Sequence, residues 1–231
     1  MKLQRNDETR VEKCVGKWLD DHFYNNTEIF DETERVHDLA RQVAGIDVVA
    51  KKGGSDNVLN IDEKVKYYKA LNTTIETIGF ELVRTIRDGR RTPGWFVDSQ
   101  SRTTHYSLLS LYLKDRSEDP KAITYDNIDY IVNLLVNARE IKEYFANYLS
   151  TLPKQSFSYK DLLDIVMNGP GDKVLPDGMT YKSDEYKARL FLTKDMWITY
   201  SKTFREQPVN LVVTRNLLKS LRQTEEHIIN A

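Results

Sequence analysis

The chain holds a single cysteine, Cys14, among its 231 residues. One cysteine cannot form an internal disulfide, which fits a reducing compartment, and Cys14 itself is expected to be a small buried apolar side chain. No apolar run approaches the roughly 20 residues that span a bilayer, and residues 1–8 lack the apolar segment of a secretory signal. The sequence therefore predicts a cytoplasmic protein with no membrane partner.

Several catalytic and binding signatures are also missing. There is no GxxxxGK[ST] phosphate loop and no GxSxG nucleophile turn, which gives no support to a nucleotide hydrolase of that type or to a serine hydrolase. The four histidines show no metal-ligand spacing, and no helix-turn-helix, zinc-finger or RNA-recognition signature is present.

Net charge is close to zero, at −1, which weighs against non-specific binding of nucleic acid. The charge is uneven, however: residues 1–40 hold ten acids and six bases, while residues 41–91 hold seven acids and ten bases. The most concentrated basic stretch runs from Arg84 to Arg91. The charge balance therefore weakens the prediction of nucleic-acid binding without excluding it.

Hydrophobic periodicity predicts an α/β fold, a mixed sheet flanked by helices. Helices are expected over 8–24, 32–42, 125–149 and 159–168, the last capped by Ser158, with a final helix capped by Thr214. Strands are expected over 45–49, 60–64, 75–86, 95–98, 103–113, 186–193, 196–200 and 209–213. With no repeat or linker, we expect one domain over 1–231: a core at 8–113, and accessory helices and strands, rich in helix, packed on it from 121 to 231.

The stretch that carries most chemistry is a predicted hairpin. Gly45-Ile-Asp47-Val-Val and Asn60-Ile-Asp62-Glu63-Lys64 flank a glycine-containing turn. Since strand side chains alternate between faces, Asp62 and Lys64 project together and Glu63 projects the other way. If Asp47 faces the same side, two carboxylates and an ammonium converge. Two hard oxygen ligands suit Mg²⁺ and the lysine suits activation of a water, so the pattern predicts metal-assisted phosphodiester hydrolysis.

A helix, a strand bearing Asp and a strand bearing acid-x-Lys resemble the PD-(D/E)XK nuclease superfamily over roughly residues 8–113. Further stretches resemble an uncharacterised bacterial and phage group within it: Arg41-Gln-x-x-Gly-Ile-Asp47, Ile61-Asp-Glu-Lys64, Phe80-Glu-Leu82, Gly94-Trp95, Thr104-x-Tyr106 and Glu206-Gln-Pro-Val-Asn-Leu211. The leading proline of the superfamily motif is replaced by Ile46.

The resemblance implies a restriction-endonuclease-like fold and a Mg²⁺-dependent endonuclease acting on duplex or branched DNA, with Mn²⁺ as a substitute ion and a homodimer as one arrangement. It places Asp47 and Asp62 on the metal, with Lys64 beside the attacking water. Glu12, on the first helix, is a further metal ligand by the same resemblance. The alternative is a catalytically silent nuclease-fold protein that binds nucleic acid or a partner protein.

Each candidate also has a simpler interpretation. Asp47 and Asp62 would be solvated if the hairpin face is exposed, as would Lys64 at a strand end. A one-residue bulge would exchange the roles of Asp62 and Glu63. Glu81 lies on the strand at 75–86, which we expect beside the hairpin, and either joins catalysis or supports the site through a salt bridge.

Six basic residues are candidates for contact with DNA phosphates, and each is otherwise a solvated side chain of a turn. They are Arg84, Arg87, Arg90 and Arg91 of the basic loop, with Lys51 and Lys52 at the hairpin tip. The many aromatic residues suggest base stacking, but Tyr67, Tyr68, Trp95 and Tyr106 are expected to be packing residues.

Overall fold

The computed structural model describes residues 5–26, 28–53, 57–65, 71–86, 88–153, 157–204 and 206–231. It is a mixed α/β protein that divides into two compact units. The first unit comprises Met1–Ile75, Arg102–Ala138 and Arg222–Ala231, and the second comprises Glu76–Ser101 and Arg139–Leu221. Within the described ranges, no helix combines the length and apolar character needed to cross a membrane.

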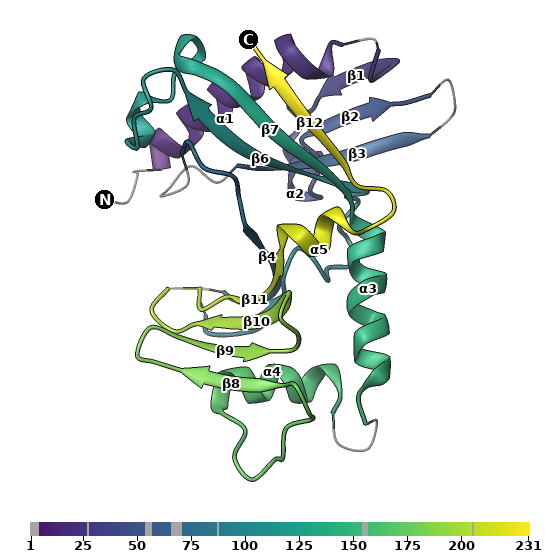
Figure 1. Cartoon of the computed structure of the whole chain (residues 1–231), viewed down its shortest axis with the longest axis vertical. Coiled ribbons are helices and arrows are strands. Elements are labelled where there is room, and N and C mark those ends of the chain that lie inside the picture. The colour runs from purple at the N-terminus through teal and green to yellow at the C-terminus, as the bar shows by residue number, and fades with distance from the viewer. Residues whose placement is uncertain are drawn as a thin grey trace. The chain divides into compact units, whose positions relative to one another are not determined.

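The first unit is a six-stranded sheet with the order β1-β2-β3-β6-β7-β12 (Figure 1). Neighbouring strands are antiparallel except β3 and β6, which are parallel. The strands are β1 (Glu32–Arg35), β2 (Val48–Lys51), β3 (Val58–Val65), β6 (His105–Leu113), β7 (Ile128–Asn137) and β12 (Glu225–Asn230). The remaining elements are α1 (Arg5–Leu19), a π-helical turn η1 (Asp20–Tyr24), α2 (Leu39–Val43) and two 3₁₀ turns, η2 (Pro120–Ala122) and η3 (Tyr125–Asn127).

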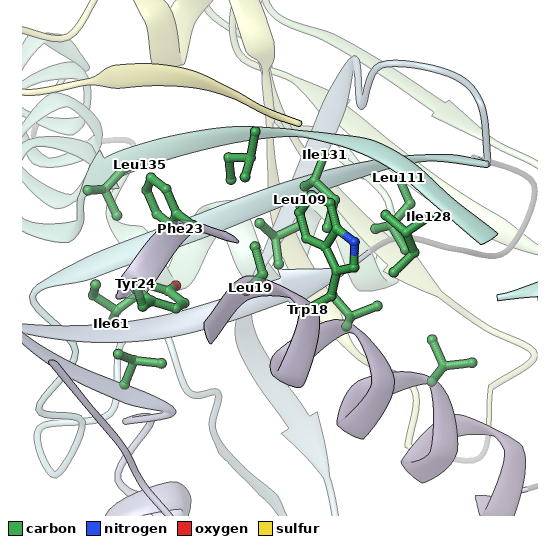
Figure 2. Packing of buried hydrophobic residues seen from close by; sticks show 14 of the residues in the cluster. Trp18, Leu19, Phe23, Tyr24, Ile61, Leu109, Leu111, Ile128, Ile131 and Leu135 are labelled. Atoms are coloured by element: carbon green, nitrogen blue, oxygen red, sulfur yellow. The ribbon is translucent and has the colours of Figure 1, made fainter. Parts of the chain in front are cut away.

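Helix α1 forms the core of the first unit with one face of this sheet. Its buried residues Val11, Val15, Trp18 and Leu19 recur at helical spacing. All four share a cluster with strand residues such as Ile61 and Leu109. Figure 2 shows Trp18 and Leu19 among these strand residues. Burial of side chains this large supplies the main favourable free energy for forming the unit. The even-numbered residues of β3 project from the opposite face.

The second unit holds a separate six-stranded sheet, ordered β5-β4-β11-β10-β9-β8 and antiparallel throughout. Its strands are β4 (Thr77–Thr85), β5 (Arg91–Pro93), β8 (Thr180–Ser183), β9 (Lys187–Phe191), β10 (Met196–Ser201) and β11 (Val209–Thr214). Its helices are α3 (Ala138–Thr151), α4 (Tyr159–Asn168) and α5 (Arg215–Lys219). Helix α4 packs on β9 and β10, and α5 packs on β11.

Much of the predicted local structure is confirmed. The first helix, the hairpin, the strand at 75–86 and the strand at 103–113 are present, as are the three later strands. Ser158 caps α4 with a full capping box, in which its side chain accepts from Asp161 N and the Asp161 carboxylate accepts from Ser158 N. Thr214 caps α5 by accepting a hydrogen bond from Leu217 N.

Three predicted elements are wrong. Residues 32–35 form edge strand β1 and only 39–43 are helical, where a helix over 32–42 was expected. Residues 128–137 form β7, so the expected helix at 125–149 begins only at Ala138. Residues 94–98 form a turn that packs on β4, where a strand over 95–98 was expected.

The arrangement of the elements also differs from expectation. The predicted core at 8–113 coincides with neither unit, because residues 76–101 belong to the second. A helix-rich C-terminal elaboration is not confirmed, since the described residues from Thr180 onward contribute five strands and one short helix. A single domain and a restriction-endonuclease-like fold therefore remain predictions.

Candidate functional site

Asp47, the residue just before β2, lies opposite Asp62 of β3 in the first unit. Val48 of β2 is paired with Ile61 of β3, and Asp47 N donates to the Ile61 carbonyl over 2.8 Å. Continuing this antiparallel register by one residue places Asp47 across from Asp62. Ile61 lies in the core beneath α1, so the two carboxylates occupy the other face of the sheet, together with Lys64. The predicted convergence of these three side chains is present.

Burial leaves this carboxylate pair with little solvent to stabilise its charge. The Asp62 side chain is 8% exposed and forms an ion pair with Lys64, its Oδ1 lying 2.7 Å from Nζ. Burial raises the pKa of Asp62 although the Lys64 ammonium opposes the shift. Burial, and then the negative charge of Asp62, raise the pKa of Asp47 to about 6. The pair therefore carries more negative charge than one lysine offsets.

The backbone of β3 fixes the orientation of Asp47. Its Oδ2 accepts a hydrogen bond of 2.8 Å from Glu63 N, which lowers the pKa and opposes the effect of burial. Tyr106 of β6 forms another side of the site, because the parallel register places it next to Asp62. Tyr106 is fully buried, and burial followed by the charge of Asp62 raises the pKa of its hydroxyl. The expectation that Tyr106 is a packing residue agrees with its burial.

Glu63 faces away from the carboxylate pair, as predicted, and no bulge exchanges it with Asp62. Its carboxylate binds the guanidinium of Arg35 from β1 through two contacts of 2.8 and 3.2 Å. The Arg35 guanidinium also donates to Asp20 over 2.7 Å and to the Gly16 carbonyl over 3.0 Å. This arginine thus joins the end of α1, the π-helical turn and β3 beneath the candidate site.

Gly16 is part of this contact, because a Cβ there would lie 3.1 Å from the guanidinium carbon of Arg35. Tyr24, at the end of the π-helical turn, is fully buried nearby, and burial and the charge of Glu63 raise its pKa. Sequence reasoning missed the role of Arg35 because it assigned residues 32–42 to a helix. The signal for a strand is the period of two in Glu32-Thr33-Glu34-Arg35, in which Glu32 and Glu34 share the exposed face and Thr33 and Arg35 share the other.

Glu12 is not brought to the site. It is exposed on α1, which covers the face of the sheet opposite to Asp62. Across the part of the chain that the structure describes, no three His, Cys, Asp or Glu side chains form a group that could hold a metal ion. A three-carboxylate site with Glu12 is therefore not formed.

The strand that carries Glu81 does not pair with the hairpin, which corrects the expected position. Its strand, β4, lies in the sheet of the second unit, between β5 and β11. There the turn at Gly94 approaches β4 closely, and Phe96 N donates to the Glu81 carbonyl over 3.1 Å. The half-buried Glu81 is a residue of the second unit, held against this turn.

The predicted DNA-contacting residues are divided between the units. Lys51 and Lys52 belong to the first unit and pair with Glu32 and Glu225. The exposed Arg84, Arg90 and Arg91 belong to the second, where Arg90 pairs with Asp88 over 2.6 Å. Arg87, like Tyr67 and Tyr68, lies outside the described residues. The described members of this set are therefore divided, two in the first unit and three in the second.

The chemistry of the donor set fits a Mg²⁺ ion held by two carboxylates and water. Mg²⁺ binds proteins through one or two carboxylates and keeps several waters, so a third carboxylate is not required. A divalent cation between Asp47 and Asp62 would relieve the repulsion that raises the pKa of Asp47. The comparisons with known proteins add no further guide: no family model, no curated protein and no solved structure matches this chain.

Proposed function

We propose that the first unit is a Mg²⁺-dependent phosphodiester hydrolase that acts on DNA. The observation that carries the proposal is the pair of opposed carboxylates, Asp62 buried and Asp47 half-buried, with the Lys64 ammonium 2.7 Å from the Asp62 carboxylate. An uncompensated buried charge costs free energy unless a partner neutralises it, so proteins retain such pairs mostly where they bind or react. The resemblance of these three residues to the PD-(D/E)XK motif supports the same chemistry.

Asp47, just before β2, and Asp62, on β3, would hold the ion. When bound, Mg²⁺ would lower the pKa of a coordinated water and polarise the phosphoryl oxygen. The hydrogen bond from Glu63 N orients the Asp47 carboxylate toward Asp62. The side chain of Glu63 projects from the other face of the sheet and binds Arg35. The site is thus fixed from both faces of β3, as a preorganised centre requires.

Lys64 would have two roles: to position or deprotonate the attacking water, and to offset negative charge. In the present arrangement its ammonium offsets Asp62. Once a cation neutralises that carboxylate, the ammonium is available to orient the attacking water or to stabilise negative charge that develops on the phosphate. Cutting both strands of a duplex would then need two copies of the site, which a homodimer would supply.

The test is cleavage of linear, plasmid and branched DNA with Mg²⁺ or Mn²⁺, by wild type and by Asp62→Asn and Lys64→Ala. We expect metal-dependent cleavage that falls at least about a hundredfold in both variants, the range in which acid–base and electrostatic groups contribute. Matched controls are Asp115→Asn and Lys114→Ala, two exposed residues of the same unit, which should cut like wild type.

Two outcomes would count against a nuclease. Cleavage that survives in Asp62→Asn and Lys64→Ala would mark another site or a contaminating enzyme. Folded wild-type protein that cuts no substrate with either ion would overturn the proposal and favour the silent binding protein. Calorimetric titration of each variant with Mn²⁺ shows whether a variant that no longer cleaves DNA has lost ion binding or only the catalytic step.

A further inference from the structure

The sheet of the second unit has one face packed by helices and one face that keeps contact with solvent. Burial alternates without a break along β9, β10 and β11. The buried positions include Leu190 and Ile198, on the strands that α4 contacts, while Met196 and Leu211 meet α3 and α5 around an apolar recess. The alternate positions are all partly exposed, and they define what we term the outer face.

Two aromatic side chains lie side by side on this outer face. Phe191 of β9 is register-paired with Trp197 of β10, their ring centroids are 5.9 Å apart, and the ring planes are tilted by 35°. The Lys182 ammonium from β8 lies 5.6 Å from the centroid of the Phe191 ring. A partly exposed tryptophan and phenylalanine, in a row that Val212 continues on β11, offer adjacent flat rings to a ligand.

Cationic and hydrogen-bonding groups flank the ring pair. The next row across the sheet carries Lys182, Arg189, Thr199 and Asn210, and the row after it carries Lys187 with Ser201. At the opposite edge of the sheet, exposed Arg91 of β5 is paired with Thr85 of β4, and strand alternation places both residues on the outer face. Arg91 is one of the residues that the sequence indicated for phosphate contact.

The strand positions of this face carry four bases, Lys182, Lys187, Arg189 and Arg91, and one acid, Glu81, while Asp184, Glu185 and Asp195 lie in turns at its ends. Glu81 is half-buried beside the turn at Gly94. Asp184, in the turn between β8 and β9, accepts from Lys187 N and Tyr186 N, and these backbone hydrogen bonds lower its pKa, with Lys187 and Arg189 adding smaller effects. The outer face therefore keeps an excess of positive charge around its aromatic pair.

This combination matches the requirements for binding an unpaired nucleic-acid strand. Rings on a sheet surface stack successive bases, which a duplex would keep inside its own helix, and flanking arginines and lysines bind the phosphates. We propose that the outer face of the second-unit sheet binds single-stranded nucleic acid, with Phe191 and Trp197 stacking bases and Arg189 and Lys187 binding the backbone. All residues of this surface belong to the second unit, so the proposed binding does not depend on hydrolysis at Asp47 and Asp62. If both proposals hold, it narrows the substrate to single-stranded regions.

Binding is tested by fluorescence anisotropy of labelled 20-mers of thymidylate and uridylate beside a 20-base-pair duplex, in EDTA so that no metal-dependent cleavage interferes. We expect the single strands to bind in preference to the duplex, with affinity that falls as salt rises. Comparing thymidylate with uridylate assigns the preference between DNA and RNA.

The variants are Trp197→Leu and Phe191→Leu, which keep much of the apolar volume and protect the fold. Stacking on one ring contributes roughly 1–3 kcal/mol, so each should weaken binding of the thymidylate 20-mer by about fivefold or more. Arg189→Gln with Lys187→Gln should weaken it further and reduce the salt dependence by about two phosphate contacts. Both charge substitutions lie at the protein surface, so they still test strand binding if a ring variant fails to fold.

Tyr144→Ala is the matched control, because Tyr144 is an exposed aromatic residue of the same unit at the apolar recess on the helix-packed side. It should bind like wild type. Wild type that binds no single strand at 50 mM salt would overturn the proposal. So would binding that all four outer-face substitutions leave unchanged, or binding that Tyr144→Ala reduces equally. Asp62→Asn should bind the thymidylate 20-mer like wild type, so failure of strand binding can be distinguished from failure of the proposed hydrolase.

Discussion

At the scale of single residues, the raised pKa of Asp47 has a consequence that can be measured without substrate. The folded pKa, about 6, lies above the ordinary value of 3.8, so the folded state binds this proton more tightly than the unfolded state. The resulting contribution to stability is fully present below about pH 4 and is lost as the pH rises through 6. At neutral pH the ionised Asp47 therefore destabilises the first unit.

Asp47→Asn removes this charge while keeping an acceptor for Glu63 N. We expect it to raise the free energy of unfolding by about 1–3 kcal/mol at pH 7.5, since one pKa unit corresponds to about 1.4 kcal/mol. At pH 4 the change should vanish. Urea unfolding at both pH values measures it, and an equal effect at both would contradict the argument. Added Mg²⁺ should stabilise wild type at pH 7.5 and leave the variant nearly unaffected.

Arg35 gives a second prediction at this scale. Arg35→Met leaves the carboxylates of Glu63 and Asp20 without their partner, and Glu63 is 11% exposed. Breaking a buried pair on one side costs about 3–5 kcal/mol, which urea unfolding would detect. The control is Arg41→Met, because Arg41 pairs with Glu34 in solvent and such pairs contribute at most about 1 kcal/mol. Equal losses in the two variants would refute a buried role for Arg35.

At the scale of elements, the sequence predicted the hairpin, its facing residues and the capped helices well. Asp47, Asp62 and Lys64 follow from strand alternation, which is a local rule. The strand β7 was not predictable in the same way. Residues Ile131–Val136 are all buried, on both faces, so apolar residues occupy odd and even positions alike and do not alternate. Such a stretch cannot be told from a buried helix by periodicity.

The positions of Glu12, Glu81 and Arg35 depend on pairings between distant segments, which local patterns do not contain. β4 was expected beside the hairpin because it follows it in the chain, but it pairs with β11, more than a hundred residues later. The edge strand at Glu32–Arg35 carries three acidic or basic residues of low strand propensity, and this favoured the helix that sequence reasoning assigned there.

The turn at Gly94 gives a prediction for one element. A Cβ at Gly94 would lie 2.3 Å from the Glu81 carbonyl oxygen, so Gly94→Ala forces the turn away from β4. We expect a loss of about 1–3 kcal/mol or more in the free energy of unfolding. Gly89→Ala is the comparison, because a Cβ there meets nothing within 4 Å and only its φ of +83° is unfavourable, at about 1 kcal/mol. A smaller loss for Gly94→Ala than for Gly89→Ala would contradict the close approach.

At the scale of the whole molecule, the two candidate surfaces belong to different units and should act independently. Asp62→Asn should weaken Mn²⁺ binding and leave the affinity for a thymidylate 20-mer unchanged, and Trp197→Leu should do the reverse. In the double variant the two losses should equal those of the single variants within about 0.5 kcal/mol. Calorimetry for the ion and anisotropy for the strand measure both, and a clear departure from additivity would show coupling between the units.

The interleaving of the chain between the two sheets also bears on how the protein is made. When residues 1–138 have left the ribosome, the first unit still lacks β12, and β4 still lacks its partner β11. The two sheets are complete only after β11 and β12 have been synthesised. Until then a nascent molecule carries open strand edges, and β4 and β7 are exposed to pairing with other chains.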